Sequence, residues 1–380
     1  MNHTGIDDWD PRDPAVQKDQ RGAYDEMRER CPVAQSEFMG WSLFRHQDVA
    51  DVLADPETYS SASRHLAIPN GMDPPVHGQY RDALTPHFSS DPIAALEPRC
   101  RQIATDLLGP MLAAGEAEFI DAFATPFPLR TLCAFLGWPE KLWECLGGWT
   151  HGNLEAAFSG DRAAGKALTR LFSEHVKANL DVRRTAPSDT GDVTDRLLAT
   201  LVDGTQLDDE QIVSILRNWT AGHGTVSAGL SILVLHLAEQ PEIQQRLRSD
   251  PALIPAAVEL ILRTDDPLVA NRRTTTRAVE IGGRAIPEGA RLSLMWIAAN
   301  RDPRAFKDPE SMEPRDGLDG SLVWGRGIHL CLGAPLARLE MRVALEELLA
   351  RTERFELTTD APCRSAYPSN GLATLGLRFR

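Results

Sequence analysis

The segment Trp324-Gly-Arg-Gly-Ile-His-Leu-Cys-Leu-Gly333 constrains this 380-residue chain more than any other. It contains Cys331 and directly precedes a predicted amphipathic helix over 334–351. Free N–H groups at a helix start stabilise a thiolate, and the flanking glycines let the backbone approach a flat group. One cysteine cannot complete a tetrahedral zinc site, and no CxxC or HExxH motif lies nearby. A single thiolate is, however, sufficient as the axial ligand of a haem iron.

The segment resembles the haem-ligand loop of the cytochrome P-450 family, whose usual pattern is Phe-Gly-x-Gly-x-His-x-Cys-x-Gly. Every fixed position matches except the first, where Trp324 replaces phenylalanine. A buried cysteine that only caps a helix is the alternative, and it leaves the matching neighbours unexplained. The resemblance implies haem b ligated through the iron by Cys331. It also implies haem contacts from Trp324, Gly325 and Gly333.

The hydrophobic periodicity predicts a mainly helical protein with small β-sheets at its edge. A long helix is predicted over Asp208–Glu239, where Asp208 and Gln211 form a capping pair. Strands are predicted near 41–44, within 274–296 and within 355–380, including a hairpin at Gly282-Gly283 that Arg291–Trp296 extends. The resemblance implies one cytochrome P-450 domain over 1–380. The long helix would lie over the haem and the cysteine loop on the proximal side.

Charge and cysteine content restrict the partners and the compartment. The net charge is −14, from 40 basic and 54 acidic residues, which argues against binding to nucleic acid. The six cysteines lack the spacing of a disulfide framework, and Met1–Asp13 is polar. The apolar stretch Leu230–Leu237 is too short to span a bilayer. We therefore expect a cytoplasmic protein without a membrane anchor, similar to the soluble bacterial members of the family.

The long helix contains Thr220-Ala-Gly-His-Gly-Thr-Val226. Each glycine inside a helix costs about 1 kcal/mol relative to alanine, so a reason is needed, and close helix packing is one. The family pattern is Ala-Gly-x-(Asp/Glu)-Thr, which Ala221, Gly222 and Thr225 match. The resemblance implies that Ala221 contacts the haem, that Gly222 leaves room for dioxygen and that Thr225 supplies a hydroxyl. Gly224 replaces the proton-relaying acid, which leaves a route through water or substrate.

Four basic residues are predicted to bind the haem propionates. The motif Asp73-Pro-Pro-Val-His77 with Arg81 resembles the family pattern, and His77 and Arg81 share a helix face because they are four residues apart. Arg273 and His329 fall where the family places two further donors. Each alone fits a solvated surface group, whereas together they fit an anionic ligand.

The family also carries a Glu-x-x-Arg motif, and here the chain departs from it. Arg263 matches the arginine, but Leu260 occupies the glutamate position. Glu259 lies one residue early, about 100° round the helix, and is predicted to pair with Arg263 as an i,i+4 neighbour. An acid between 301 and 316 is the alternative partner. Arg315 takes the usual arginine place in that region.

The resemblance places a substrate pocket on the distal side. Its wall is predicted from the residues after the Arg263 helix and from the C-terminal region: Leu268, Val269, Ala270, Asn271 and Leu372. Only twelve residues separate Ser60 from Asp73, which is short for the distal loop of the family. The pocket is therefore expected to be open, or covered by Arg64, His65 and Leu66.

These features predict a haem-thiolate monooxygenase that acts with O2 on a small or medium organic molecule in secondary metabolism. Electrons would come from NAD(P)H through a separate ferredoxin and ferredoxin reductase, with Arg326, Arg338 and Arg342 placed to meet an acidic partner. An oxidative coupling or peroxide-using enzyme is the alternative that needs no acid at Gly224. A catalytically silent haem protein, acting in ligand binding or recruitment, is the alternative of another class.

Overall fold

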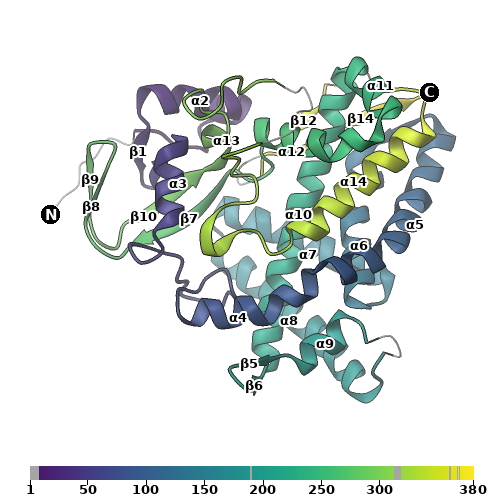
Figure 1. Ribbon diagram of the computed structural model, residues 1–380, viewed down its shortest axis with the longest axis horizontal. Helices are drawn as coiled ribbons and strands as arrows, with labels where there is room; N and C mark the ends of the chain where they lie inside the picture. Colours follow the sequence, from purple (N-terminus) through teal and green to yellow (C-terminus); the bar gives the residue numbers. More distant parts are fainter. Residues whose placement is uncertain (1–7, 189–190, 312–317, 359–360, 366, 368) are drawn as a thin grey trace.

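The computed structural model describes residues 8–188, 191–311, 318–358, 361–365, 367 and 369–380. Helix α10 (Asp209–Glu239) runs through the middle of the molecule, and other helices surround it (Figure 1). Its start is a capping box, in which the Asp208 side chain accepts from the Gln211 backbone and the Gln211 side chain accepts from the Asp208 N–H. The predicted long helix and its capping pair are thus confirmed.

The main core forms where α10 packs against four helices: α6 (Pro126–Leu136), α8 (Arg162–Thr185), α12 (Ile254–Thr264) and α14 (Ala334–Arg351). Leu230, Leu233 and Leu237 of α10 are fully buried in this core. Each such leucine contributes about 1.5–3 kcal/mol through the removal of apolar surface from water. α5 (Ser90–Ala114) packs along α14 and closes one side of the core.

Further helices cover the ends of this core. They are α1 (Pro14–Lys18), α2 (Gln20–Arg30), α3 (His46–Ala54), α4 (Val76–Leu84), α7 (Trp143–Ser159), α9 (Val193–Ala199), α11 (Pro241–Ser249) and α13 (Trp296–Ala299). α1 and α2 are separated at Asp19, whose side chain accepts from the N–H of Gly22 and caps α2. The mainly helical fold with small sheets at the edge is confirmed.

One five-stranded sheet lies beside the helical core (Figure 1). Its order is β1 (Val33–Ser36), β2 (Gly40–Leu43), β10 (Arg291–Met295), β7 (Ala270–Thr275) and β3 (Tyr59–Ser60). The expectation that β10 extends the Gly282-Gly283 hairpin is wrong, because β10 pairs with β2 and β7. That hairpin, β8 (Val279–Ile281) with β9 (Arg284–Ile286), is a separate pair. Both turn glycines have positive φ, which a residue with a side chain rarely adopts.

The C-terminal strands form a second sheet. β11 (Phe355–Leu357) pairs antiparallel with β14 (Gly376–Phe379), as predicted, and β4 (Glu116–Glu118) joins the other edge of β14. Two short pairs complete the described strands: β12 (Cys363–Arg364) with β13 (Leu372–Thr374), and β5 (Leu201–Val202) with β6 (Thr205–Gln206).

Within the described residues, α10 alone is long and apolar enough to cross a membrane, with a mean hydropathy of 1.3 in its most apolar window. That window is 67% buried inside the protein.

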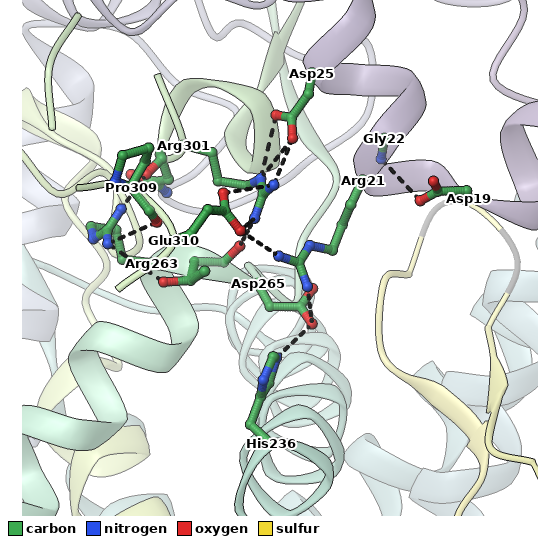
Figure 2. A network of polar contacts seen from close by, with 12 residues as sticks. Asp19, Arg21, Gly22, Asp25, His236, Arg263, Asp265, Arg301, Pro309 and Glu310 are labelled. Atoms are coloured by element: carbon green, nitrogen blue, oxygen red, sulfur yellow. Dashed lines mark hydrogen bonds and ion pairs between the residues drawn. The ribbon is translucent and has the colours of Figure 1, made fainter. Parts of the chain in front are cut away.

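A buried polar network ties α2, α10 and the end of α12 together (Figure 2). The carboxylate of Asp265, which is fully buried, accepts from His236 at 3.0 Å and from Arg364 at 2.6 Å, and Arg21 lies 3.7 Å away. Burial would raise the pKa of Asp265, but the bond from His236 and the charge of Arg364 outweigh it and hold the pKa below its usual range. The network therefore requires an ionised Asp265.

Candidate functional site

The loop before α14 holds Cys331 in a defined position. The backbone N–H of Cys331 donates to the carbonyl of Trp324 at 2.8 Å, and α14 begins three residues later. Gly325 and Gly327 have φ of 72° and 70°. A Cβ at Gly327 would lie 2.6 Å from the carbonyl oxygen of Leu53, so close backbone contact as well as positive φ requires glycine there.

The surroundings of Cys331 were expected to stabilise a thiolate, but their net effect raises the pKa of the thiol. Burial raises the pKa of the thiol. The backbone N–H groups of Gly333 and Ala334 and the charges of Arg81 and Arg338 act in the opposite direction. The expected stabilisation of a thiolate by the helix start is therefore present, but burial outweighs it. Cys331 as a whole residue is exposed.

Glu259 does not pair with Arg263, so that prediction is wrong. Its carboxylate accepts from the indole N–H of Trp324 at 2.8 and 3.0 Å and from Nε of Arg338 at 2.6 Å. The Arg338 guanidinium also stacks over the Trp324 ring, 4.7 Å from its centroid. Because Glu259 lies one residue early on α12, it faces the cysteine loop and braces the position where Trp324 replaces phenylalanine.

Arg263 is held by other groups. It donates from Nη1 to the carbonyl of Asn300 at 2.8 Å and from Nη2 to the carbonyl of Pro309 at 3.1 Å, and it lies over the ring of Phe306. Figure 2 shows it on the opposite side of Arg301 from Asp25. Leu260 is 4% exposed and belongs to the core. Arg315, which was predicted to take the usual arginine place in the region 301–316, lies outside the described residues.

The middle of α10 presents an open face. Ala221 and Gly222 are exposed although their helix is otherwise mostly buried. A Cβ built at Gly222 would meet nothing within 4 Å, so close packing of the protein does not explain this glycine. Thr225 lies one turn after Ala221 and is half-buried. Its hydroxyl has no hydrogen bond to any described residue, whereas the hydroxyl of Thr220 donates to the carbonyl of Leu216.

Close packing does explain Gly224. A Cβ at this position would lie 2.8 Å from Cγ2 of Thr150 on α7. Thr150 is β-branched and its hydroxyl is bonded to the carbonyl of Leu146, so its methyl group cannot easily turn away. The residue that replaces the usual acid is thus the one at which α7 lies directly against α10.

The four predicted propionate donors lie together. His77 of α4 and His329 of the cysteine loop are ring neighbours, with centroids 4.4 Å apart. The pKa of His329 is lowered to about 3, mainly by burial and in addition by the charges of Arg273, His77 and Arg81. Burial also lowers the pKa of Arg273, which extends from β7. Two arginines from separate segments, Arg81 of α4 and Arg273 of β7, therefore bring positive charge beside the neutral imidazoles of His77 and His329.

This arrangement fits an anionic, flat group with a metal that takes one soft ligand. Nε2 of His77 and Nε2 of His329 are buried, and among the described residues neither has a hydrogen-bond partner. A buried polar atom without a hydrogen-bond partner destabilises the fold by about 1–3 kcal/mol. A carboxylate oxygen that accepts a hydrogen bond from each imidazole would remove this cost. Within the described part of the chain, no group of three or more His, Cys, Asp or Glu could hold a metal ion. Cys331 and the donors thus fit haem.

The predicted pocket wall is only partly accessible. Asn271 is exposed and Leu268 and Ala270 are half-buried, whereas Val269 is fully buried in a core cluster with Tyr24. Alternation along an extended segment turns Val269 away from its neighbours. Leu372 is 5% exposed and its N–H donates to the hydroxyl of Ser231 on α10. We therefore leave Val269 out of the pocket.

Sequence reasoning missed how the distal loop is attached. Ser214 of α10 donates to the carbonyl of Leu66 and accepts from the N–H of Ile68, both at 3.0 Å. Asn218 donates to the carbonyl of Ile68 at 2.8 Å, and Arg217 donates to the carbonyl of Leu66. The short spacing from Ser60 to Asp73 was the available signal, because a short loop must run close to the helix.

Sequence reasoning also missed a buried ionisable pair beneath the open face of α10. Nε2 of His223 lies 3.5 Å from the carboxylate of Glu340 on α14, and both side chains are buried. The other ring nitrogen, Nδ1, contacts the carbonyl of Trp219 at 2.8 Å, which fixes it as a donor. Burial lowers the pKa of His223, but the carboxylate of Glu340 outweighs it and the net pKa is raised.

The comparisons with known proteins agree with this site. The model of the family Cytochrome P450 matches residues 149–375. The erythromycin C-12 hydroxylase of Saccharopolyspora erythraea is 36% identical over 351 residues, covering 88% of this chain and 87% of the relative. The cyclomarin C epoxidase CymV of Salinispora arenicola is 34% identical over 354 residues, covering 88% and 89%.

Solved structures show the same fold. A mutant of P450 EryK in complex with erythromycin B superposes with a TM-score of 0.88 at 32% identity, covering 96% of this chain and 97% of that one. CalO2 superposes with a TM-score of 0.88 at 28% identity, covering 99% of both chains. This chain belongs to the cytochrome P450 family. It is therefore a haem-thiolate oxidoreductase of the monooxygenase type, in agreement with the resemblance of its cysteine loop.

Proposed function

We propose that this protein uses O2 and electrons from NAD(P)H to insert oxygen into a small or medium organic molecule in bacterial secondary metabolism. A separate ferredoxin and ferredoxin reductase would deliver the electrons, and the protein would act in the cytoplasm. The supporting observation is the position of Cys331 in a glycine-held loop beside the cluster of four basic donors. Relatives that are hydroxylases and epoxidases of natural products support the reaction class.

In this proposal haem b supplies the oxidising chemistry, and the chain supplies its binding and surroundings. Cys331 ligates the iron, and Trp324, Gly325 and Gly333 shape the loop around it. His77, Arg81, Arg273 and His329 donate to the propionates.

The distal side of the proposed site is formed mainly by α10. Ala221 and Gly222 provide the open face against which substrate is oriented. The hydroxyl of Thr225 holds a proton and has no hydrogen-bond partner among the described residues. Leu268, Ala270, Asn271 and Leu372 contribute to the pocket wall and exclude water.

Gly224 favours a second candidate reaction. With no acid at this position and with Thr150 filling the space, proton delivery by the usual side chain is absent. A peroxide-using reaction needs less proton delivery than hydroxylation with O2 does, because hydrogen peroxide already carries the two protons. An oxidative coupling is the related alternative, in which the substrate loses hydrogen atoms and gains no oxygen. The two reactions differ in the product, because only monooxygenation places one atom from 18O-labelled O2 in the organic molecule.

The absorption spectrum of the dithionite-reduced protein under carbon monoxide tests the ligand. Cys331→Ser should abolish the red-shifted thiolate band, since an alcohol is a poor, protonated ligand. Cys145→Ser, at another exposed cysteine, is the matched control and should retain the band. If Cys331→Ser retains it, another cysteine holds the iron and the proposal fails. Turnover with a ferredoxin system then separates an enzyme from a silent haem protein.

The basic residues proposed to meet a ferredoxin are partly engaged within the chain. Arg342 pairs with Glu97 at 2.6 Å and with Glu346 at 3.0 Å, and Arg338 pairs with Glu259. An acidic partner would have to compete with these carboxylates, so Arg326, which is exposed, remains the most available of the three.

A further inference from the structure

Arg217 shares the open face of α10 with Ala221 and Thr225. The three residues are spaced by four, which places them on one side of the helix. A rise of 1.5 Å per residue puts the Arg217 backbone about 6 Å along the axis from Ala221 and about 12 Å from Thr225. The helix face that the proposed function assigns to substrate therefore carries a guanidinium one turn before Ala221.

No acid accompanies this arginine. Its single hydrogen bond among the described residues is from Nη2 to the carbonyl of Leu66, and no described carboxylate lies within ion-pair distance. Burial alone lowers the pKa of Arg217. Arg101 and Arg342, in contrast, each contact two or three glutamates. Arg248 and Arg291 also lack a carboxylate among the described residues, but each donates to at least two backbone carbonyls. In a chain of net charge −14, a half-buried arginine without an acid needs an explanation.

The distal loop adds a second donor, His65, next to Arg217, whose guanidinium is bonded to the adjacent residue Leu66. His65 lies near enough for the charge of Arg217 to lower its pKa, an effect that adds to that of burial. Nδ1 of His65 contacts the hydroxyl of Ser63 at 3.0 Å, which leaves Nε2 for another partner. Arg64 is exposed beside it in the chain. Arg217, His65 and Arg64 all lie in segments that are held in place by the hydrogen bonds between the distal loop and α10.

We propose that Arg217, with His65, forms a subsite for an anionic group of the substrate, a carboxylate in the first instance. This inference rests on the proposed function, whose substrate class it names. The bond from Nη2 to Leu66 orients the guanidinium and uses one of the two hydrogens on that nitrogen. The other hydrogen on Nη2 leaves one bidentate edge of the guanidinium free, which matches the two oxygens of a carboxylate. The backbones of Arg217 and Thr225 lie about 12 Å apart along the helix axis, so the anionic group and the oxidised carbon belong to opposite ends of an elongated substrate.

The alternative is that Arg217 only fastens the distal loop, and the neighbouring residue provides a control for it. Asn218→Ala removes the bond to the carbonyl of Ile68 but keeps the charge at 217. Arg217→Gln removes the charge but keeps a polar N–H on the same face of the helix. Arg217→Lys keeps the charge without the paired donors. The three variants thus separate loop attachment from recognition of an anion.

The experiment measures binding of 8-phenyloctanoate and of its neutral amide, 8-phenyloctanamide, by calorimetry and by the spin-state change of the haem. The wild type should bind the carboxylate about 10-fold or more tightly than the amide, as hydrogen bonds to a charged group predict. Arg217→Gln should reduce this preference to within about 3-fold, and Arg217→Lys should retain part of it. Asn218→Ala should weaken both ligands equally.

Two results would overturn the proposal. The first is a wild type that does not prefer the carboxylate, including one that binds neither probe. The second is a preference that survives in Arg217→Gln. The reduced carbon monoxide spectrum is recorded for every preparation, so loss of the thiolate band reports failure of the proposed function separately. Calorimetry reads the carboxylate preference independently of that band.

Discussion

Removing one member of the His223–Glu340 pair should cost much more stability than removing both. Two unit charges 3.5 Å apart attract by about 5 kcal/mol at an effective dielectric constant near 20. His223→Leu leaves the buried carboxylate of Glu340 without its partner, and should lower the free energy of unfolding by about 3–5 kcal/mol. Glu340→Gln keeps an N–H for Nε2 of His223, so its cost should be near 1–2 kcal/mol.

The double variant His223→Leu/Glu340→Met tests the coupling. It should regain most of the loss of His223→Leu, because no charge then remains to be buried. Guanidinium unfolding followed by circular dichroism, with Glu340→Met alone completing the cycle, gives the coupling energy. We expect at least about 2 kcal/mol. Effects that add to within about 0.5 kcal/mol would show that the two side chains do not interact and would refute the reasoning.

The pH dependence of stability gives an independent measurement. The folded-state pKa of His223 is raised above its unfolded value of about 6.5, so the pair retains a proton that the unfolded chain releases. Its stabilisation is fully present below about pH 6.5 and is lost as pH rises through the raised pKa, by up to about 1.4 kcal/mol per pH unit. The difference in unfolding free energy between wild type and double variant should fall from pH 6 to 9. A difference independent of pH would exclude proton retention.

Three further substitutions test the contacts around the site, each by denaturant unfolding. Gly224→Ala should lower the free energy of unfolding by about 1–3 kcal/mol through its 2.8 Å approach to Thr150, and Thr150→Ala should restore most of it. Leu260→Glu should lower it by at least about 2 kcal/mol, because Arg263 is already bonded, whereas Leu260→Met should be nearly neutral. Trp324→Phe should cost about 1–2 kcal/mol by removing the indole N–H from its carboxylate, yet keep the thiolate band. A stabilised Leu260→Glu, a tolerated Gly224→Ala or a Trp324→Phe without the band would contradict these contacts.

The sequence predicted best where a local pattern is physically sufficient. The bounds of α14 and the capping pair of α10 agree with the prediction, because a proline near a helix start and an Asp-x-x-Gln pair are local signals. The predicted amphipathic character of α14 is wrong, because residues on most of its faces are buried. The gathering of His77, Arg81, Arg273 and His329 followed only from the family resemblance, since their segments are distant in the chain. No periodicity within one element reports on such a cluster.

The prediction failed where partners come from other elements. Glu259 was assigned to Arg263 on i,i+4 spacing, but Trp324 and Arg338 of the cysteine loop and α14 bind its carboxylate instead. The strand over 291–296 was assigned to the neighbouring hairpin, but β10 pairs with β2 and β7 instead, and β8 and β9 pair only with each other. The pairing of His223 with Glu340 could not be predicted from the sequence, since 117 positions separate them. Neither of the segments in which they lie indicates a contact with the other.

The contact between Gly224 and Thr150 also limits how this chain can change. Any side chain at 224 meets the methyl group of Thr150, so an acid cannot be introduced there by one tolerated substitution. A smaller residue at 150 has to come first, and by itself it leaves a gap between α7 and α10. The usual acid is therefore separated from this sequence by a mutational step that brings no immediate benefit. Libraries randomised at both positions should yield Asp or Glu at 224 only together with Ala or Gly at 150.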